Sequence, residues 1–442
     1  MRKWLSLISK HALLGIGLLI HMAFFISASR TKWFDFFFSG IALHLCCRGL
    51  DFYTVPNGAY AYLHGGGSLG FAPNSTPYTY GVGFPAVDPT ANHPLLVLLV
   101  GAFLMLFSPA WSFYVWMFIK LFVYLAVLIY FYVNFKDSKY IRLAIFLSLI
   151  NSTQYLEIEI SQFQFILNMF LFLMLIILAK NEKSRLGGLF YFLTLIAKAI
   201  GLLWMPLFFF KQHFKMLVVG VGLFLIATVV FLFNHSGDYY IDWLFNNFFS
   251  SYIQGPTQIF TLYALLKYST SLSNNALVAI KYGSLALVIL LSASKRIRLQ
   301  MGLFLAIAYY LLFYNLTYEY HYTTLIPILA VCLVMCPEFQ QLSSRICITL
   351  ISLPSVLFLL HLLYSWHFKL GPFDATTTIT MDPFLGPDPT PLGWQLSVLS
   401  RILPVIGLAI CVVRPFVIPI IKDGLAFVKT IRKANQAHEV FG

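Results

Sequence analysis

The sequence is poor in charge, and poorest in acidic residues. Only 10% of its 442 residues are Asp, Glu, Lys or Arg, and Asp and Glu together number 16. A soluble domain carries about 25% charged residues, so this composition excludes an ordinary soluble protein. Hydrophobic residues make up 60% of the chain. Many apolar runs reach the ~20 residues that a helix needs to cross a bilayer. The sequence therefore predicts an all-α, polytopic transmembrane helical bundle.

Motifs for several chemistries are missing. The six cysteines do not form the pattern of a disulfide framework. Cys332 and Cys336 lie four apart with no His or acidic pair beside them, so a metal site is not indicated. There is no Gly-rich phosphate loop and no nucleophile elbow. We expect no cofactor and no metal.

Basic residues are in excess, with a formal net charge of +13. In a soluble protein this excess would suggest nucleic acid, but in a membrane protein it marks cytoplasmic loops and contacts with anionic lipid. We therefore expect no nucleic-acid partner. Basic loops placed inside give about 10–12 helices, ten of them full crossings in our count, with both termini cytoplasmic. We expect one integral domain over residues 1–442, in the cytoplasmic (plasma) membrane of a prokaryote.

A long polar interruption, Gly49–Asn92, separates the first two apolar regions. A loop of ~40 residues is uncommon in a compact protein and is usually functional or disordered. Its aromatic residues argue against disorder, since they can bury surface. We expect a first outer loop over 29–110 with juxtamembrane helices at Trp33–Arg48 and His93–Phe107. Further outer segments are expected at 234–273 and 365–396.

The apolar stretch Leu186–Phe210 is broken by Lys198, Gly201 and Pro206. Both flanks are basic, which predicts a helical hairpin with Lys198 near its outer tip. A single full span is the competing interpretation. A charged group at membrane depth costs ~3 kcal/mol or more, so Lys198 either reaches to a headgroup or binds a phosphate.

Polar groups gather at the expected outer boundary. Asp51 can take a proton from an acceptor hydroxyl, or it forms a loop salt bridge with Arg48. Gln164 and Asn168 lie one turn apart on one helix face, where they bind substrate or join helices by hydrogen bonds. The run Tyr318–Tyr322 contains Glu319 and His321. An interfacial aromatic belt explains its tyrosines but neither of these two residues.

The order of these features resembles glycosyltransferase family 87. Its members are polytopic C-type glycosyltransferases that use a polyprenyl-phosphate sugar. The resemblance covers about Asp51 to Pro327 and rests on Asp-Phe-Tyr in the outer loop, His93-Pro94, Gln162 with Asn168, Lys198, and Tyr318–Tyr322. The chain departs from the family's usual residues in three places: Asn92-His93-Pro94 for Tyr-Pro-Pro, Ser161-Gln162 for Gly-Gln, and Ala199 after the lysine for Pro.

The resemblance implies the C-type architecture and a function. The enzyme would move a hexose, with mannose as the family's prior, from a polyprenyl-phosphate donor to a lipid or glycan acceptor. The reaction would invert configuration on the extracytoplasmic side. Asp51 would be the general base, and Lys198 and His321 would receive the leaving phosphate. The other expected substrate-binding residues are Tyr53, Asp88, His93, Gln162, Gln164, Asn168, Glu319 and Tyr322.

The alternative is a transporter or flippase for a lipid-linked or small polar substrate. Transporters often contain internal repeats and bind their substrate at the bilayer midplane. This sequence has no evident repeat, and its polar groups gather toward one surface. The pattern therefore favours the enzyme.

Overall fold

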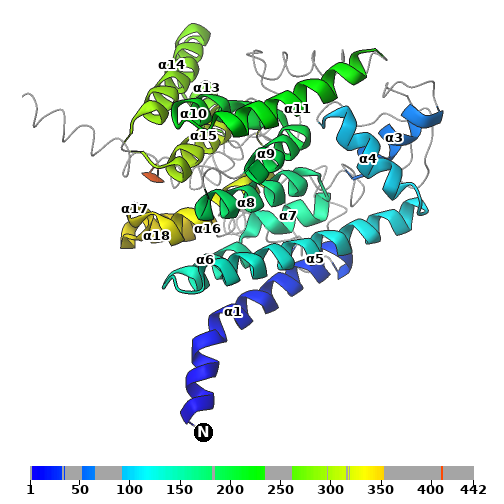
Figure 1. Cartoon of the computed structure of the whole chain (residues 1–442). Helices are drawn as coiled ribbons and strands as arrows, with labels where there is room; N and C mark the ends of the chain where they lie inside the picture. The colour runs from blue at the N-terminus through cyan, green and yellow to red at the C-terminus, as the bar shows by residue number, and fades with distance from the viewer. Residues whose placement is uncertain are drawn as a thin grey trace, which may run out of the picture.

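The structure is a computed structural model, and it describes residues 2–31, 34, 52–64, 92–181, 185–233, 261–295, 297–314, 317, 319–352 and 410–411. The described residues form helices and connecting turns, with no strand among them. The all-α prediction is confirmed for this part of the chain. In Figure 1, α1 lies at one edge of the bundle and α14 at the opposite edge.

The elements of the first half are α1 (Arg2–Ile26), the π-helical turn η1 (Ser27–Thr31), α3 (Thr54–His64), α4 (Pro94–Leu104), α5 (Pro109–Phe135), α6 (Ile141–Leu149), α7 (Ser152–Ile160) and α8 (Gln164–Lys180). The second half contains α9 (Arg185–Ala197), the 3₁₀ turn η3 (Ala199–Trp204), α10 (Met205–Phe210), α11 (Phe214–Leu232), α13 (Leu262–Ser269), α14 (Asn274–Ala293), α15 (Leu299–Phe313), the 3₁₀ turn η4 (Glu319–Thr324), α16 (Leu325–Met335), α17 (Pro337–Gln340) and α18 (Leu342–Ser352).

Four helical segments are long and apolar enough to cross a bilayer on their own: His11–Thr31, α5, α11 and α14. Seven shorter apolar helical segments accompany them in the described part of the chain. The outward faces of the long segments carry large apolar side chains, such as Leu19, Ile129 and Val218, which are all mostly exposed. Such faces suit lipid contact, because lipid tails are as apolar as these side chains. The chain is a multi-pass integral membrane protein, while the expected ten crossings stay a prediction.

Helices α6 and α7 form one broken helix beside α1. Nδ1 of His21 on α1 lies 3.3 Å from the carbonyl oxygen of Leu149. Asn151 then caps α7, since its Oδ1 accepts a hydrogen bond from the amide of Thr153 at 3.0 Å. Asn151 therefore restarts the helix, and the side chains of residues 152–159 are buried inside the bundle.

The stretch 185–210 folds back on itself, as the hairpin prediction requires. The hydroxyl of Tyr191 on α9 donates to the carbonyl oxygen of Gly201 at 2.9 Å, and its ring meets Phe208 on α10. At the open end, Gly188 near the start of α9 lies directly against Met216 near the start of α11. Both ends of the segment therefore lie on the same side of the bundle. Lys198 stands at the bend between α9 and η3, so the single-span alternative is wrong.

Helices α3 and α4 from the expected first loop pack closely together (Figure 1). A Cβ on Gly101 would come within 2.5 Å of Ala59 Cβ and 2.6 Å of the Val55 carbonyl oxygen. Only glycine fits at that crossing. Helix α4 corresponds to the short helix expected at His93–Phe107, while the expected helix at Trp33–Arg48 lies almost wholly outside the described residues.

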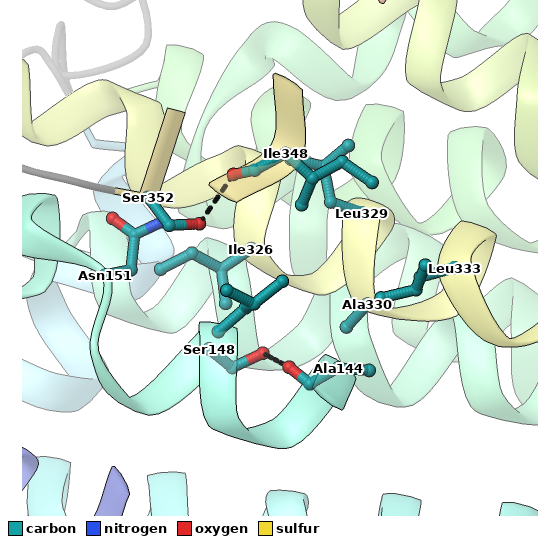
Figure 2. Close-up of a pocket in the computed structure, with 10 residues that line it drawn as sticks. Ala144, Ser148, Asn151, Ile326, Leu329, Ala330, Leu333, Ile348 and Ser352 are labelled. Atoms are coloured by element: carbon teal, nitrogen blue, oxygen red, sulfur yellow. Dashed lines mark hydrogen bonds between the residues drawn. The ribbon is translucent and has the colours of Figure 1, made fainter. Parts of the chain in front are cut away.

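A small pocket lies between α6, α16 and α18 (Figure 2). The Ser148 and Ser352 hydroxyls at its wall donate back to their own helices, to the carbonyls of Ala144 and Ile348. With these hydroxyls turned away, Asn151 is the main polar group, and the rest of the lining is apolar. The lining of this pocket contains no charged residue, so the pocket includes none of the expected charged site residues.

Candidate functional site

Two side chains from distant parts of the sequence meet at the hairpin bend. Lys198 Nζ lies 3.0 Å from Nε2 of His321 on η4. A charged ammonium can only donate, so Nε2 accepts and the neutral imidazole carries its proton on Nδ1. His321 is buried, and Lys198 is partly exposed. An ammonium and an imidazole donor in one apolar surrounding suit an anionic oxygen. The structure thus brings together two residues that the sequence analysis chose for a leaving phosphate.

The start of α8 holds η4 in place. Nε2 of Gln164 donates to the Thr324 hydroxyl, and Nδ2 of Asn168 donates to the Thr323 hydroxyl at 2.8 Å. The interhelical hydrogen bonds considered for these two amides are therefore present. Their amide oxygens, Oε1 and Oδ1, accept no hydrogen bond from the described residues. The amide groups fix the turn that carries His321.

The turn before α8 makes a third link to η4. Nε2 of Gln162 donates to the hydroxyl of Tyr320 at 2.7 Å. Tyr322, an expected substrate-binding residue, is buried in the core. Glu319 begins η4 by its backbone, and its side chain lies outside the described residues. Tyr320, His321 and Tyr322 are therefore buried in the bundle rather than exposed as an interfacial belt would be.

His93 is the N-cap residue of α4. Its Nδ1 accepts from the amide of Leu95 at 3.1 Å, and its Nε2 lies 3.1 Å from the hydroxyl of Thr228 on α11. The side chain is fully buried with both ring nitrogens on protein groups, so this conformation does not offer it to a substrate. Its backbone amide donates to the carbonyl oxygen of Ile196, just before the hairpin bend. In this structure His93 positions the start of α4, and its expected contact with substrate stays a prediction.

Asp51 and Asp88, two expected site residues, lie outside the described part of the chain. Phe52, the residue after Asp51, is fully buried, and its ring stacks on Phe163 with centroids 6.1 Å apart. Phe163 stands between Gln162 and Gln164. Tyr53, expected to contact substrate, donates its hydroxyl to the carbonyl oxygen of Pro109 at 3.3 Å. The chain next to Asp51 therefore packs against the turn that holds η4.

A buried ion pair is the feature that sequence reasoning missed. Lys120 on α5 places Nζ 2.9 Å from Oε2 of Glu157 on α7, and the two side chains are only 3% and 1% exposed. The available signal was a lysine in the middle of an apolar span, the same signal that singled out Lys198. The partner could not be read, because 37 positions separate the two residues.

Ser161 joins α7 to α8 in an unusual backbone conformation. Its φ of 58° and ψ of 39° are left-handed, and the residue is fully buried. This conformation costs an L-residue roughly 1 kcal/mol, while glycine adopts it freely. The turn carries Gln162 and Gln164, so its backbone matters to η4.

We expect Ser161→Gly to unfold at a temperature equal to or above that of the wild type, because the left-handed strain of about 1 kcal/mol is removed. Ser161→Val, the matched control, should unfold at a lower temperature, because a β-branched residue fits this region worst. Thermal unfolding in detergent measures both. If the glycine variant lost as much stability as the valine variant, the account of this turn would be wrong.

Among the described residues, no group of three or more His, Cys, Asp or Glu gathers as metal ligands would.

Comparison with protein families assigns the chain to a known family. The family model of glycosyltransferase family 87 matches residues 92–342, which is more than half of the 442-residue chain. The match includes Lys120, Glu157, Lys198 and His321. A search of curated proteins found no match.

Proposed function

Because the chain belongs to glycosyltransferase family 87, we propose that it moves a hexose from a polyprenyl-phosphate donor to a lipid or glycan acceptor. Mannose is the first sugar to test. The proposal places the reaction on the extracytoplasmic side of a prokaryotic cytoplasmic membrane, with both termini cytoplasmic. The observation that carries it is the contact between Lys198 and His321 at the bend of an apolar hairpin.

The leaving group explains why a cation belongs at this depth. A polyprenyl phosphate is an anion on a long apolar chain, so its site must offer positive donors within reach of lipid. Lys198 supplies the charge, and the Nδ1 proton of neutral His321 supplies a second donor. Donors fixed before the reaction stabilise the charge that develops on the phosphate oxygen. The side-chain amides of Gln162, Gln164 and Asn168 hold η4 in position by hydrogen bonds. Because His321 lies on η4, they also fix the position of its ring.

Asp51 is the proposed general base. Its carboxylate takes the proton from the acceptor hydroxyl while the acceptor oxygen attacks the anomeric carbon. The bond from that carbon to the phosphate oxygen breaks, and the phosphate leaves with the electron pair. Attack from the face opposite the leaving group inverts the configuration. Support comes from Phe52, which packs on Phe163 in the turn next to η4.

The sugar-binding residues complete the proposal. Asp88 and Glu319 are candidates to accept hydrogen bonds from sugar hydroxyls. Gln164 and Asn168 add their amide oxygens, which accept nothing from the described residues. Tyr53, Gln162 and Tyr322 act by shaping the surrounding protein.

The test is release of polyprenyl phosphate by purified protein in detergent. We expect release from polyprenyl-phosphate mannose when a lipid extract of the producing organism supplies the acceptor. Polyprenyl-phosphate glucose tests the choice of sugar. A transporter or flippase would release nothing, because detergent removes the compartments. Absence of release with both donors would contradict the proposed donor class.

A further inference from the structure

The turn between α7 and α8 contacts both α5 and η4. The Ser161 hydroxyl donates to Sδ of Met117 on α5 at 3.3 Å. The side-chain amides of Gln162 and Gln164 donate to hydroxyl groups of η4. Phe163 lies between these two glutamines in the chain, and its side chain is only 2% exposed. The turn therefore connects α5 to η4, and the ring of Phe163 is buried at its centre.

The ring of Phe163 lies nearly parallel to two other rings. Trp116 on α5 stacks on it with centroids 4.8 Å apart and 23° between the planes. Phe52, which follows Asp51 in the chain, stacks with centroids 6.1 Å apart and 13° between the planes. Aromatic pairs at such separations attract each other in addition to the surface that they bury. Phe163 therefore joins the chain after Asp51 to the turn that holds η4.

One face of α5 supports both of these parts. Phe113 meets the ring of Phe52 edge-on with centroids 5.7 Å apart, and Trp116 stacks on the turn. Further along α5, Lys120 forms a 2.9 Å ion pair with Glu157 on α7. These three α5 residues are three and four positions apart, which is the spacing of one helix face. Helix α5 is thus a common frame for the chain at Phe52 and for the turn.

The proposed reaction needs its base and its phosphate-binding groups at a fixed separation. In that mechanism the base acts on one face of the sugar, and the phosphate leaves from the opposite face. A misplacement of about 1 Å can lower a rate by roughly 10²-fold. The proposed base, Asp51, is bonded to Phe52, and His321 lies on η4. The position of Phe163 therefore bears on both sides of the reaction.

We propose that Phe163 is a positioning residue, which fixes the segment that carries Asp51 relative to η4 and His321. This inference rests on the proposed function and deepens it. The side chain acts through its ring contact with Phe52. When that ring is removed, the hydrogen bonds from the neighbouring glutamines still hold η4. Loss of the ring therefore disturbs the alignment of the base more than the binding of the donor.

The first experiment measures the steady-state kinetics of full-length Phe163→Leu in detergent. Leucine keeps the site apolar and removes the stacking ring. We expect kcat to fall by roughly 10- to 100-fold, as misplacement of a reacting group does in other enzymes. KM for the lipid-linked donor and Kd for polyprenyl phosphate should match those of the wild type. Phe52→Leu removes the partner ring and should give the same split.

The second experiment tests whether Phe163 acts through Asp51. In the Asp51→Asn background the base is already lost, so Phe163→Leu should not lower the residual rate further. A purely structural role predicts the same fold-loss in both backgrounds, because independent effects add as free energies. That result would overturn the proposal, and so would an unchanged kcat in folded Phe163→Leu. If Phe163→Leu does not fold, the same two measurements on Phe52→Leu decide.

Phe339→Leu is the matched control. Phe339 on α17 is 1% exposed and packs edge-on against Phe304 with centroids 5.1 Å apart. All of α16 separates it from η4 in the chain. The control should unfold at a lower temperature than the wild type, because a buried ring is lost, and should keep the wild-type kcat. An equal loss of kcat in Phe339→Leu would assign the effect to general packing and contradict the inference.

The outcomes separate this inference from the proposed function. If the wild type releases no polyprenyl phosphate, or if Asp51→Asn is fully active, the proposed function fails together with the inference. If the wild type and Asp51→Asn behave as expected and Phe163→Leu keeps its kcat, only the inference fails.

Discussion

Asp51→Asn should reduce sugar transfer by roughly 10²- to 10⁴-fold, the usual contribution of a general base. The amide matches the carboxylate in size but cannot take the acceptor proton. Donor binding should persist, because Lys198 and His321, the residues proposed to bind the phosphate, are unchanged. Initial rates at saturating donor and acceptor measure the loss, and size-exclusion chromatography confirms that the variant is folded.

Asp137→Asn is the matched control. Asp137 is exposed in the turn between α5 and α6, at the other end of α5 from the residues near Phe52. Its replacement should leave the rate unchanged. A folded Asp51→Asn variant with full activity would remove Asp51 from the mechanism and require another base.

Lys198→Met should reduce kcat/KM for the lipid-linked donor by roughly 10²- to 10³-fold, as loss of one preorganised donor does in other enzymes. The long apolar side chain keeps the volume at the bend and removes the charge. His321 also loses the partner at 3.0 Å. KM for the acceptor should change little, because in the proposed mechanism the acceptor attacks the face of the sugar opposite the phosphate.

The split between donor and acceptor is the informative part. Initial rates over a grid of donor and acceptor concentrations give both constants, and Lys211→Met controls for general loss of a lysine. Should the donor constants of Lys198→Met equal those of the wild type, Lys198 would have no phosphate role.

The hairpin could be read from the sequence, because two basic flanks cannot lie on opposite sides at low cost. The choice of Lys198 and His321 followed from similar reasoning, since charged or polar groups in apolar runs require an explanation. Their contact was beyond reach, because 123 positions separate them. The sequence identified Lys198 and His321 as candidates, whereas their contact depends on the packing of η4 against α8.

The role of α7 was missed for a physical reason. Its nine residues contain Glu157, Glu159 and little periodic apolar character, which is typical of an exposed turn. Lys120 overrides that pattern, because it compensates Glu157 inside the bundle. Such compensation is a tertiary property. The sequence showed both charges and gave no means of pairing them.

A structure of the protein with polyprenyl phosphate bound tests the central claim most directly. The account predicts a phosphate oxygen within hydrogen-bonding distance, about 3 Å, of Lys198 Nζ and of the His321 ring. Phosphate bound away from the hairpin bend, with these two side chains unchanged, would contradict it.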